Sequence, residues 1–111
     1  MKKSSIVVII SICCLFGCKK QDPGTPGPNE IFLEYKTFSP TQLEIIKGTT
    51  VTFTNKDNAN HSATSTTKLF DSGKISSDNS FTHTFNDVGV FYFYCKYHSS
   101  NPQEQGAIMV K

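Results

Sequence analysis

Three side chains in this sequence have the chemistry of ligands for a soft transition metal. Cys95 ends an aromatic-rich run, and His98 follows it three residues later. A thiolate and an imidazole this close together suit such a metal. A second imidazole, His61, lies far upstream, after the polar stretch 55–60. The three side chains can share one ion only if the fold brings both loops to one end of the molecule.

The elements that must position these residues have the pattern of β-strands. In the stretch 50–55, Val51 and Phe53 fall on one face and threonines on the other, which predicts a strand with one buried and one solvated face. Other runs rich in β-branched or aromatic residues predict strands at 31–38, 42–47, 62–66, 80–85, 90–95 and 106–111. No helical period, repeat or second domain is evident, so the sequence predicts a single all-β domain, a sandwich or small barrel.

The turn residues 86–89 separate the strands 80–85 and 90–95, which predicts a β-hairpin. In that register His83 faces Phe93. We interpret His83 as a hydrogen-bonded histidine of the core or rim rather than as a metal ligand. Asn55 and Ser62 flank the His61 loop and either hydrogen-bond the loops together or only terminate strands.

The charge balance argues against nucleic-acid binding, and the cysteine content restricts the role of Cys95. From residue 30 onward there are seven lysines, eight acidic residues and no arginine, so nothing favours nucleic-acid binding. Cys95 is the only cysteine of that part, which excludes a disulfide within the domain. A lone cysteine there is either a small buried apolar residue or a metal ligand.

The N-terminus predicts export. Residues 1–17 combine two lysines with an apolar run too short to span a bilayer, as in a signal peptide. The run ends in Leu-Phe-Gly-Cys, which resembles the lipobox of bacterial lipoproteins and predicts acylation of Cys18, although the bulky Phe16 leaves a plain secretory signal as an alternative. Residues 18–29 are then a Pro/Gly-rich linker and residues 30–111 the domain. The expected location is the bacterial cell envelope, outside the cytoplasmic membrane, on the periplasmic face or the outer membrane, with lipid as the anchor.

Two imidazoles and a thiolate in a trigonal plane, with a weak axial donor, form the blue-copper pattern of electron-transfer sites. Zinc accepts the same donors. A rigid β scaffold, with no carboxylate placed as a general base, favours copper.

The stretch from about residue 38 to 111 resembles the cupredoxins of the plastocyanin and amicyanin type. The resemblance rests on the strand before His61, the sequences His-Ser-Ala-Thr at 61–64, Phe-Asp-Ser-Gly at 70–73 and Phe-Thr-His-Thr-Phe at 81–85, and the run from Gly89 through Tyr94 and Cys95 to His98. It implies a Greek-key β-sandwich with one copper ion at one end, held by His61, Cys95 and His98. It also implies that electrons pass to and from redox partner proteins through His98, with Tyr94 as a second route. The sequence shows no paired base and no substrate-pocket signature, so we expect an electron carrier rather than an enzyme, and a monomer.

The sequence departs from that family at the axial position. Where the family usually has methionine, two residues before the glycine of the last strand, this chain has Glu104. Glu104 is the best candidate for the axial ligand, and Gln103 and Gln105 are the next. Met109 alternates to the opposite face of its strand, which argues against it. An empty or water-filled axial position is the alternative. A carboxylate favours Cu(II) and lowers the reduction potential. A copper-binding or delivery protein with a non-blue site is therefore an alternative function, and a scaffold without metal is a third.

Overall fold

The computed structural model describes residues 24–111. Its strands are short and separated by turns, as the alternating sequence predicts, and the one helical element among these residues is a single 3₁₀ turn, η1. The elements are β1 (Glu30–Glu34), β2 (Thr37–Ser39), β3 (Gln42–Ile45), β4 (Thr49–Asn55), β5 (Thr64–Ser65), β6 (Ser80–Phe85), β7 (Gly89–Tyr94), η1 (Lys96–His98) and β8 (Gln105–Val110).

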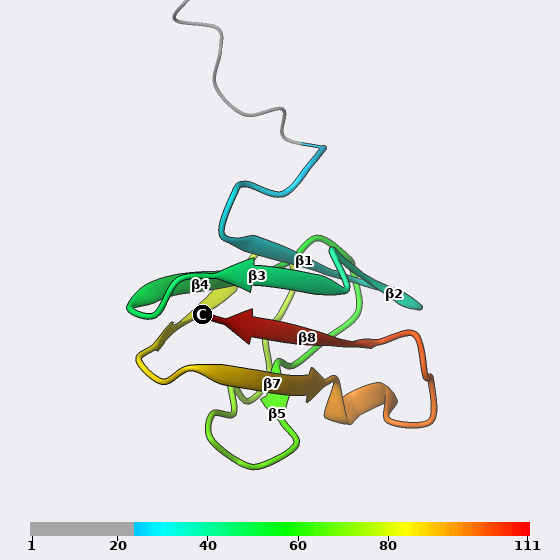
Figure 1. The fold of residues 1–111 in the computed structure, drawn as a ribbon. Helices are drawn as coiled ribbons and strands as arrows, with labels where there is room; N and C mark the ends of the chain where they lie inside the picture. The colour runs from blue at the N-terminus through cyan, green and yellow to red at the C-terminus, as the bar shows by residue number, and fades with distance from the viewer. Residues whose placement is uncertain (1–23) are drawn as a thin grey trace, which may run out of the picture.

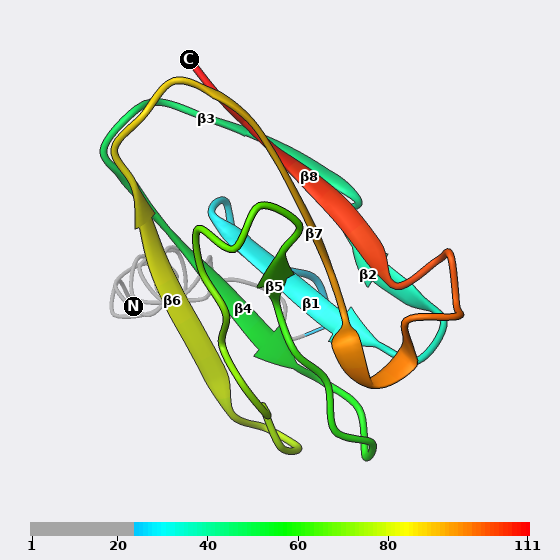
Figure 2. The same ribbon diagram turned by 90° about the horizontal axis from the view of Figure 1, so that it is seen from below.

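The strands form two mixed four-stranded sheets packed face to face. One sheet has the order β2-β1-β4-β6 and the other β3-β8-β7-β5, and the two layers are visible from below (Figure 2). In each sheet one pair is parallel, β1 with β4 and β3 with β8. This is the predicted all-β sandwich of the Greek-key type, in which the chain passes repeatedly from one sheet to the other.

Two local predictions are wrong. The run 31–38 is not one strand, because the chain reverses at Tyr35 and Lys36, where Lys36 has a φ of 67°, and β2 pairs antiparallel with β1. The segments 80–85 and 90–95 do not form a hairpin, because β6 pairs with β4 in one sheet and β7 pairs with β8 in the other. Phe85 still meets Phe91, with ring centroids 5.6 Å apart, across the core rather than along a ladder.

An aromatic core lies between the sheets and leads up to the predicted metal residues. Phe53 meets Phe93 edge to face at 5.2 Å, Phe93 stacks on Phe38 at 5.8 Å, and Phe38 meets the ring of His61 at 6.2 Å. These three phenylalanines are at most 1% exposed, and burying each one contributes roughly 1.5–3 kcal/mol. The layer is a rigid, apolar floor beneath the His61 ring.

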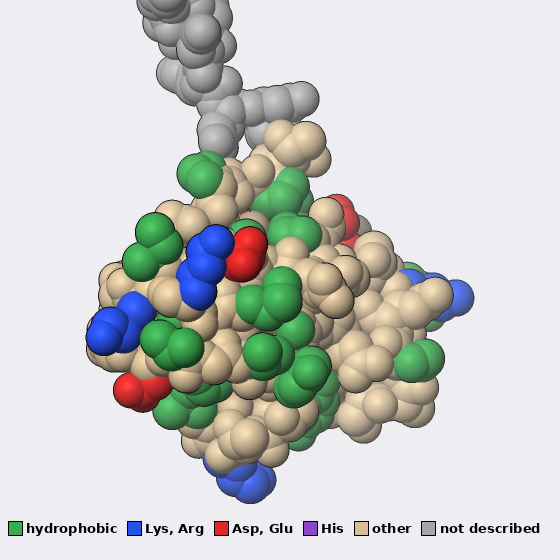
Figure 3. All heavy atoms as spheres, in the orientation of Figure 1, with side chains coloured by type: hydrophobic (Ala, Val, Ile, Leu, Met, Phe, Trp, Pro, Cys, Tyr) green, Lys and Arg blue, Asp and Glu red, His purple; other side chains and the backbone are tan. Residues whose placement is uncertain are grey.

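The ends of the sandwich differ. β7 ends and β8 begins beside η1, the orange turn in Figure 1, whereas the C-terminus lies at the other end of the sandwich. The outer face of the β3-β8-β7-β5 sheet mixes hydrophobic and polar side chains and shows no histidine (Figure 3), so the three histidines do not open onto that face.

The predicted signal peptide, the acylated Cys18 and the first half of the linker lie outside the described residues. The linker's end contacts the domain: the N–H of Gly27 donates to Glu30 Oε1 at 2.9 Å, and the Asn29 carbonyl accepts from Thr52 N–H at 2.9 Å. Within the described part, no helix has the length and apolar character needed to cross a membrane.

Candidate metal centre

Cys95, His98 and Glu104 come from one connection, between β7 and β8. The antiparallel register pairs Tyr94 with Gln105, so the next residues outward, Cys95 and Glu104, lie opposite each other where the ladder ends. The N–H of Cys95 donates to the Glu104 carbonyl at 3.1 Å, and the N–H of His98 donates to the Cys95 carbonyl at 3.2 Å. Backbone bonds thus tighten the connection into consecutive turns that aim all three side chains at one point.

His61 comes from the separate connection between β4 and β5. Its backbone exchanges hydrogen bonds of 3.1 and 2.8 Å with Ile75. Asn55, at the end of β4 and fully buried, donates from its side-chain amide to the carbonyls of Ala59 and Ile75 at 2.8 Å each. Asn55 therefore ties the His61 loop to the connection between β5 and β6, which is the hydrogen-bonding role predicted for it.

The connection between the two loops runs through Ser62. Its hydroxyl accepts a hydrogen bond of 3.0 Å from the N–H of Lys96, the residue after Cys95. The loop that carries His61 is thereby fixed against the connection between β7 and β8 that carries Cys95. This is again the hydrogen-bonding role predicted for Ser62.

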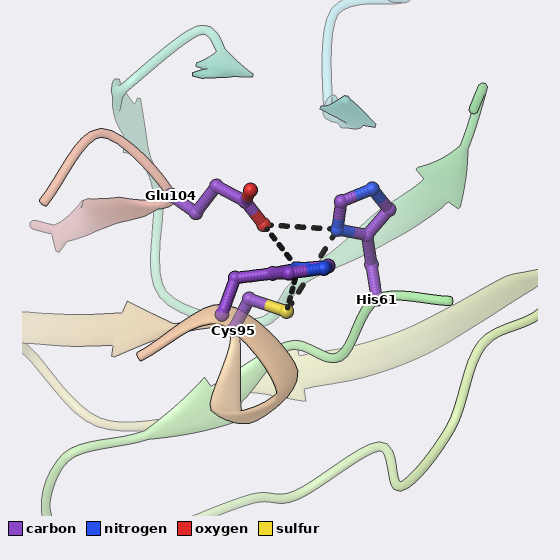
Figure 4. Close-up of side chains that lie close together, drawn as sticks. His61, Cys95 and Glu104 are labelled. Carbon is purple, nitrogen blue, oxygen red and sulfur yellow. Dashed lines mark hydrogen bonds and ion pairs between the residues drawn. The ribbon is translucent and has the colours of Figure 1, made fainter. Parts of the chain in front are cut away.

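The four side chains converge (Figure 4). Glu104 Oε1 lies 3.0 Å from His61 Nδ1 and 2.9 Å from His98 Nδ1, and Cys95 Sγ lies 3.7 and 3.4 Å from the same two nitrogens. The four donor atoms all lie within 4.8 Å of one another. The resemblance to cupredoxins predicts that His61, Cys95 and His98 converge, and the structure brings the three together with Glu104.

These separations fit one small ion. Nitrogens about 2.0 Å from a metal and a sulfur about 2.3 Å from it lie roughly 3–4 Å apart at trigonal or tetrahedral angles. The nitrogen-sulfur and nitrogen-oxygen separations here span 2.9 to 3.7 Å. The donor set, two imidazoles, one thiol and one carboxylate, is thus arranged for a soft or borderline transition metal.

Burial distinguishes the two histidines. His61, Cys95 and Glu104 are at most 1% exposed, whereas the side chain of His98 is 27% exposed. Water is kept from three of the donors, and His98 is the one that reaches the surface. The ring of Tyr35 flanks it edge to face at 6.3 Å.

In the metal-free protein, His61 keeps its second ring proton up to a pH well above the ordinary pKa of histidine. Burial lowers the pKa of His61, but hydrogen bonds with Cys95 and Asp57 and the negative charge of Glu104 together outweigh burial and raise it to about 9. A cation at this point is therefore strongly favoured by its neighbours.

Cys95 is biased toward its metal-binding thiolate form. Burial raises the pKa of the Cys95 thiol, but hydrogen bonds from His61, from the backbone of Ser62 and Tyr97, and from His98 outweigh burial and lower it overall. A thiolate is the form that binds a metal.

Glu104 is held from behind. Its second oxygen, Oε2, accepts the backbone N–H of Lys36 at 3.0 Å and the side-chain amide of Asn101 at 3.3 Å. These bonds fix the carboxylate so that Oε1 faces the histidines. No local pattern in the sequence predicts the Lys36 contact, because the turn that presents this N–H lies within the run 31–38, whose pattern is that of a single strand.

Other candidates lie elsewhere. His83 packs on Phe70 and Phe85, with ring centroids 4.8 and 4.7 Å away, and burial lowers its pKa; it is not part of the four-residue group. Gln103 is exposed, and Met109 lies well along β8 between the buried Ile108 and Val110. Glu104 is therefore the predicted axial candidate that the fold places at the site.

Known proteins share this architecture. The family model of the cupredoxin-like domain matches residues 7–110. A purple cupredoxin from Nitrosopumilus maritimus is 31% identical, with a TM-score of 0.65, over 74% of this chain and 98% of that one. Oxidised plastocyanin from Dryopteris crassirhizoma is 20% identical, with a TM-score of 0.62, over 74% and 99%. A copper-containing nitrite reductase from Thermus scotoductus is 26% identical, with a TM-score of 0.65, over 86% of this chain but 24% of that one. No curated protein sequence matches the chain.

Proposed function

Because this chain belongs to the cupredoxin-like family, we propose that it is a one-copper electron-transfer protein in which His61, Cys95 and His98 are the principal ligands and Glu104 is the fourth. One observation carries the proposal: four side chains from two separate loops place their donor atoms within 4.8 Å of one another at one end of the sandwich. The cofactor is one copper ion, as the family and the copper-containing neighbour support.

When bound, copper supplies a one-electron couple between Cu(II) and Cu(I). The chain's residues make that couple usable. The thiolate of Cys95 suits Cu(I), and the imidazoles of His61 and His98 serve both oxidation states. Hydrogen bonds fix both loops, which limits rearrangement when the electron moves. His98, 27% exposed, is the edge through which a redox partner protein gives or takes the electron.

Glu104 distinguishes this site from a family site with methionine. Its carboxylate is buried and held by Lys36 and Asn101, so a ligand role costs little reorganisation. A charged oxygen donor stabilises Cu(II) more than Cu(I). This observation also supports the second candidate, a copper-binding or delivery protein whose site holds Cu(II) without rapid electron exchange.

We also propose that the protein is a monomeric carrier, not an enzyme, tethered by acylated Cys18 to a membrane of the bacterial cell envelope, outside the cytoplasm. The support for the tether is the lipobox-like sequence. The segment before β1 joins the sandwich away from η1 (Figure 1), so a tether there leaves the His98 end free for partners.

The test is the visible and electron paramagnetic resonance spectra of the purified Cu(II) protein. We expect an intense thiolate-to-copper absorption that is lost in Cys95→Ser and strongly altered in His61→Asn. His83→Asn is the matched control, since this histidine lies outside the group, and its spectra should be unchanged. A protein that binds copper tightly but shows weak colour and wide hyperfine splitting would refute the electron carrier and favour the delivery protein.

A further inference from the structure

The two nitrogens of the His61 ring face two different carboxylates. Nδ1 faces Glu104 inside the site, and Nε2 lies 3.0 Å from Oδ2 of Asp57 on the outer side. We infer that Asp57 is a positioning residue for the metal site: it accepts a hydrogen bond from the Nε2–H of His61, which leaves the Nδ1 lone pair for the ion and shifts the site's preference toward Cu(II). This inference rests on the proposed function.

Asp57 is itself fixed for this role. Its N–H donates to the side-chain oxygen of Asn55 at 2.8 Å, and its Oδ1 accepts the N–H of Asn58 at 2.7 Å. The other carboxylate oxygen, Oδ2, is left to meet His61. Asn55 is fully buried and also donates to the carbonyl of Ile75 in the connection between β5 and β6. The buried Asn55 side chain therefore fixes the orientation of the Asp57 carboxylate.

The contact with Asp57 has two consequences for a bound metal. A hydrogen bond to Nε2 decides which ring nitrogen carries the proton, and so which one offers a lone pair to a metal. A carboxylate acceptor also makes the imidazole a stronger donor, as in carboxylate–histidine–metal arrangements. The stronger donor stabilises the divalent state more than the monovalent one, because the metal charge that it meets is larger.

His61 and His98 are therefore unequal ligands. The His61 ring is fully buried between Phe38 and the site and has a carboxylate behind it, whereas His98 is partly exposed beside Tyr35. His61 is the ligand whose donor strength sets the relative stability of Cu(II) and Cu(I), and His98 is the ligand through which electrons pass to and from partner proteins. The side chain of Asp57 is 23% exposed. It therefore lies at the protein surface and acts on the buried His61 ring through the 3.0 Å hydrogen bond to Nε2.

The decisive comparison is Asp57→Asn against Asp87→Asn in the copper protein. Asparagine keeps the shape and an acceptor oxygen but removes the charge. Asp87→Asn makes the same change of charge beyond the far end of β7, about 20 Å away along a strand of six residues. We expect Asp57→Asn to reduce the preference for Cu(II) over Cu(I) about tenfold, which is a rise of about 59 mV in midpoint potential, and Asp87→Asn to leave the potential unchanged.

A second measurement does not need copper. In the zinc-loaded protein the Nε2 proton of His61 should give a separate, slowly exchanging nuclear magnetic resonance signal. We expect this signal to move upfield in Asp57→Asn and to exchange rapidly in Asp57→Ala, with zinc affinity about tenfold lower.

Two outcomes would overturn the inference: equal potentials in Asp57→Asn and Asp87→Asn, or a ring-proton signal that does not respond to Asp57. A loss of folding stability in Asp57→Asn with an unchanged potential counts as the first of these. The absence of a copper–thiolate band in the unmodified protein would instead refute the proposed function, and the zinc experiment would still decide the role of Asp57.

Discussion

Replacing Glu104 by glutamine should raise the copper reduction potential more than any other single change of charge in this protein. The carboxylate is fully buried, and its Oε1 lies 3.0 and 2.9 Å from the ligand nitrogens of His61 and His98. Glutamine has nearly the same shape and keeps an oxygen that can accept the Lys36 N–H. The substitution therefore removes a charge while leaving the fold in place.

The magnitude follows from Coulomb's law. All donor atoms lie within 4.8 Å of one another, so the carboxylate charge acts on the metal over no more than about 4 Å. At an effective dielectric constant of about 20, a unit charge at that distance contributes about 4 kcal/mol. Reduction changes the metal charge by one unit, so the whole of that energy separates Cu(II) from Cu(I), which corresponds to about 170 mV. Because the amide keeps part of the dipole, we expect a rise of about 80–170 mV.

The assay is a spectroelectrochemical titration of the thiolate-to-copper band. Glu44→Gln is the matched control, because Glu44 undergoes the same chemical change on an exposed strand where it pairs with Lys111 at 3.4 Å, and it should leave the potential unchanged. A shift of less than about 30 mV in Glu104→Gln would mean that the carboxylate does not act on the metal, and the fourth-ligand assignment would be wrong.

Two further predictions concern the rest of the site. His61 has a pKa of about 9 in the metal-free protein, so its Nδ1 proton must leave when a metal binds. Zinc affinity, measured by competition with a chelator, should therefore rise roughly hundredfold from pH 6.5 to 8.5. A constant affinity over this range would contradict the raised pKa. Asn55→Ala removes three hydrogen bonds of a buried side chain and should lower the free energy of unfolding by about 3 kcal/mol in urea titrations, whereas Asn58→Ala, at an exposed position, should cost less than about 0.5 kcal/mol.

The family and the convergence of His61, Cys95 and His98 could be predicted because they depend on residue type and order along the chain. A thiol and an imidazole in one tight connection must lie close together whatever the details of the sheets, and alternation in β4 correctly predicted buried Val51 and Phe53. The signal peptide, the acylated Cys18 and the membrane location stay predictions.

The sheet partners could not be predicted, for a physical reason. A turn after β6 is compatible both with a hairpin and with a crossing between layers, because each reverses the chain and buries the same alternate residues. The choice depends on which edges are already taken: β4 pairs with β6, and β8 pairs with β7. These are long-range pairings that no local pattern contains.

The role of Glu104 could not be decided from the sequence for a related reason. A carboxylate in a polar loop usually faces solvent, and what turns this one inward is the N–H of Lys36, 68 residues away in the chain. Lys36 reaches that place only because the chain reverses in the middle of what looks like one strand. The candidate axial donor thus depends on the local feature that was predicted wrongly.

With these four ligands, the charges at the site all favour oxidised copper. A thiolate and a carboxylate neutralise Cu(II), so reduction leaves one net negative charge among donors of which three are at most 1% exposed. Asp57, behind His61, adds a further negative charge outside the ligands. A neutral methionine in place of Glu104 would leave the reduced site uncharged. If the proposed ligand set is right, this cupredoxin should have a lower reduction potential than one with an axial methionine in the same scaffold. As the proposed carrier it should then pass electrons most readily to partners of higher potential.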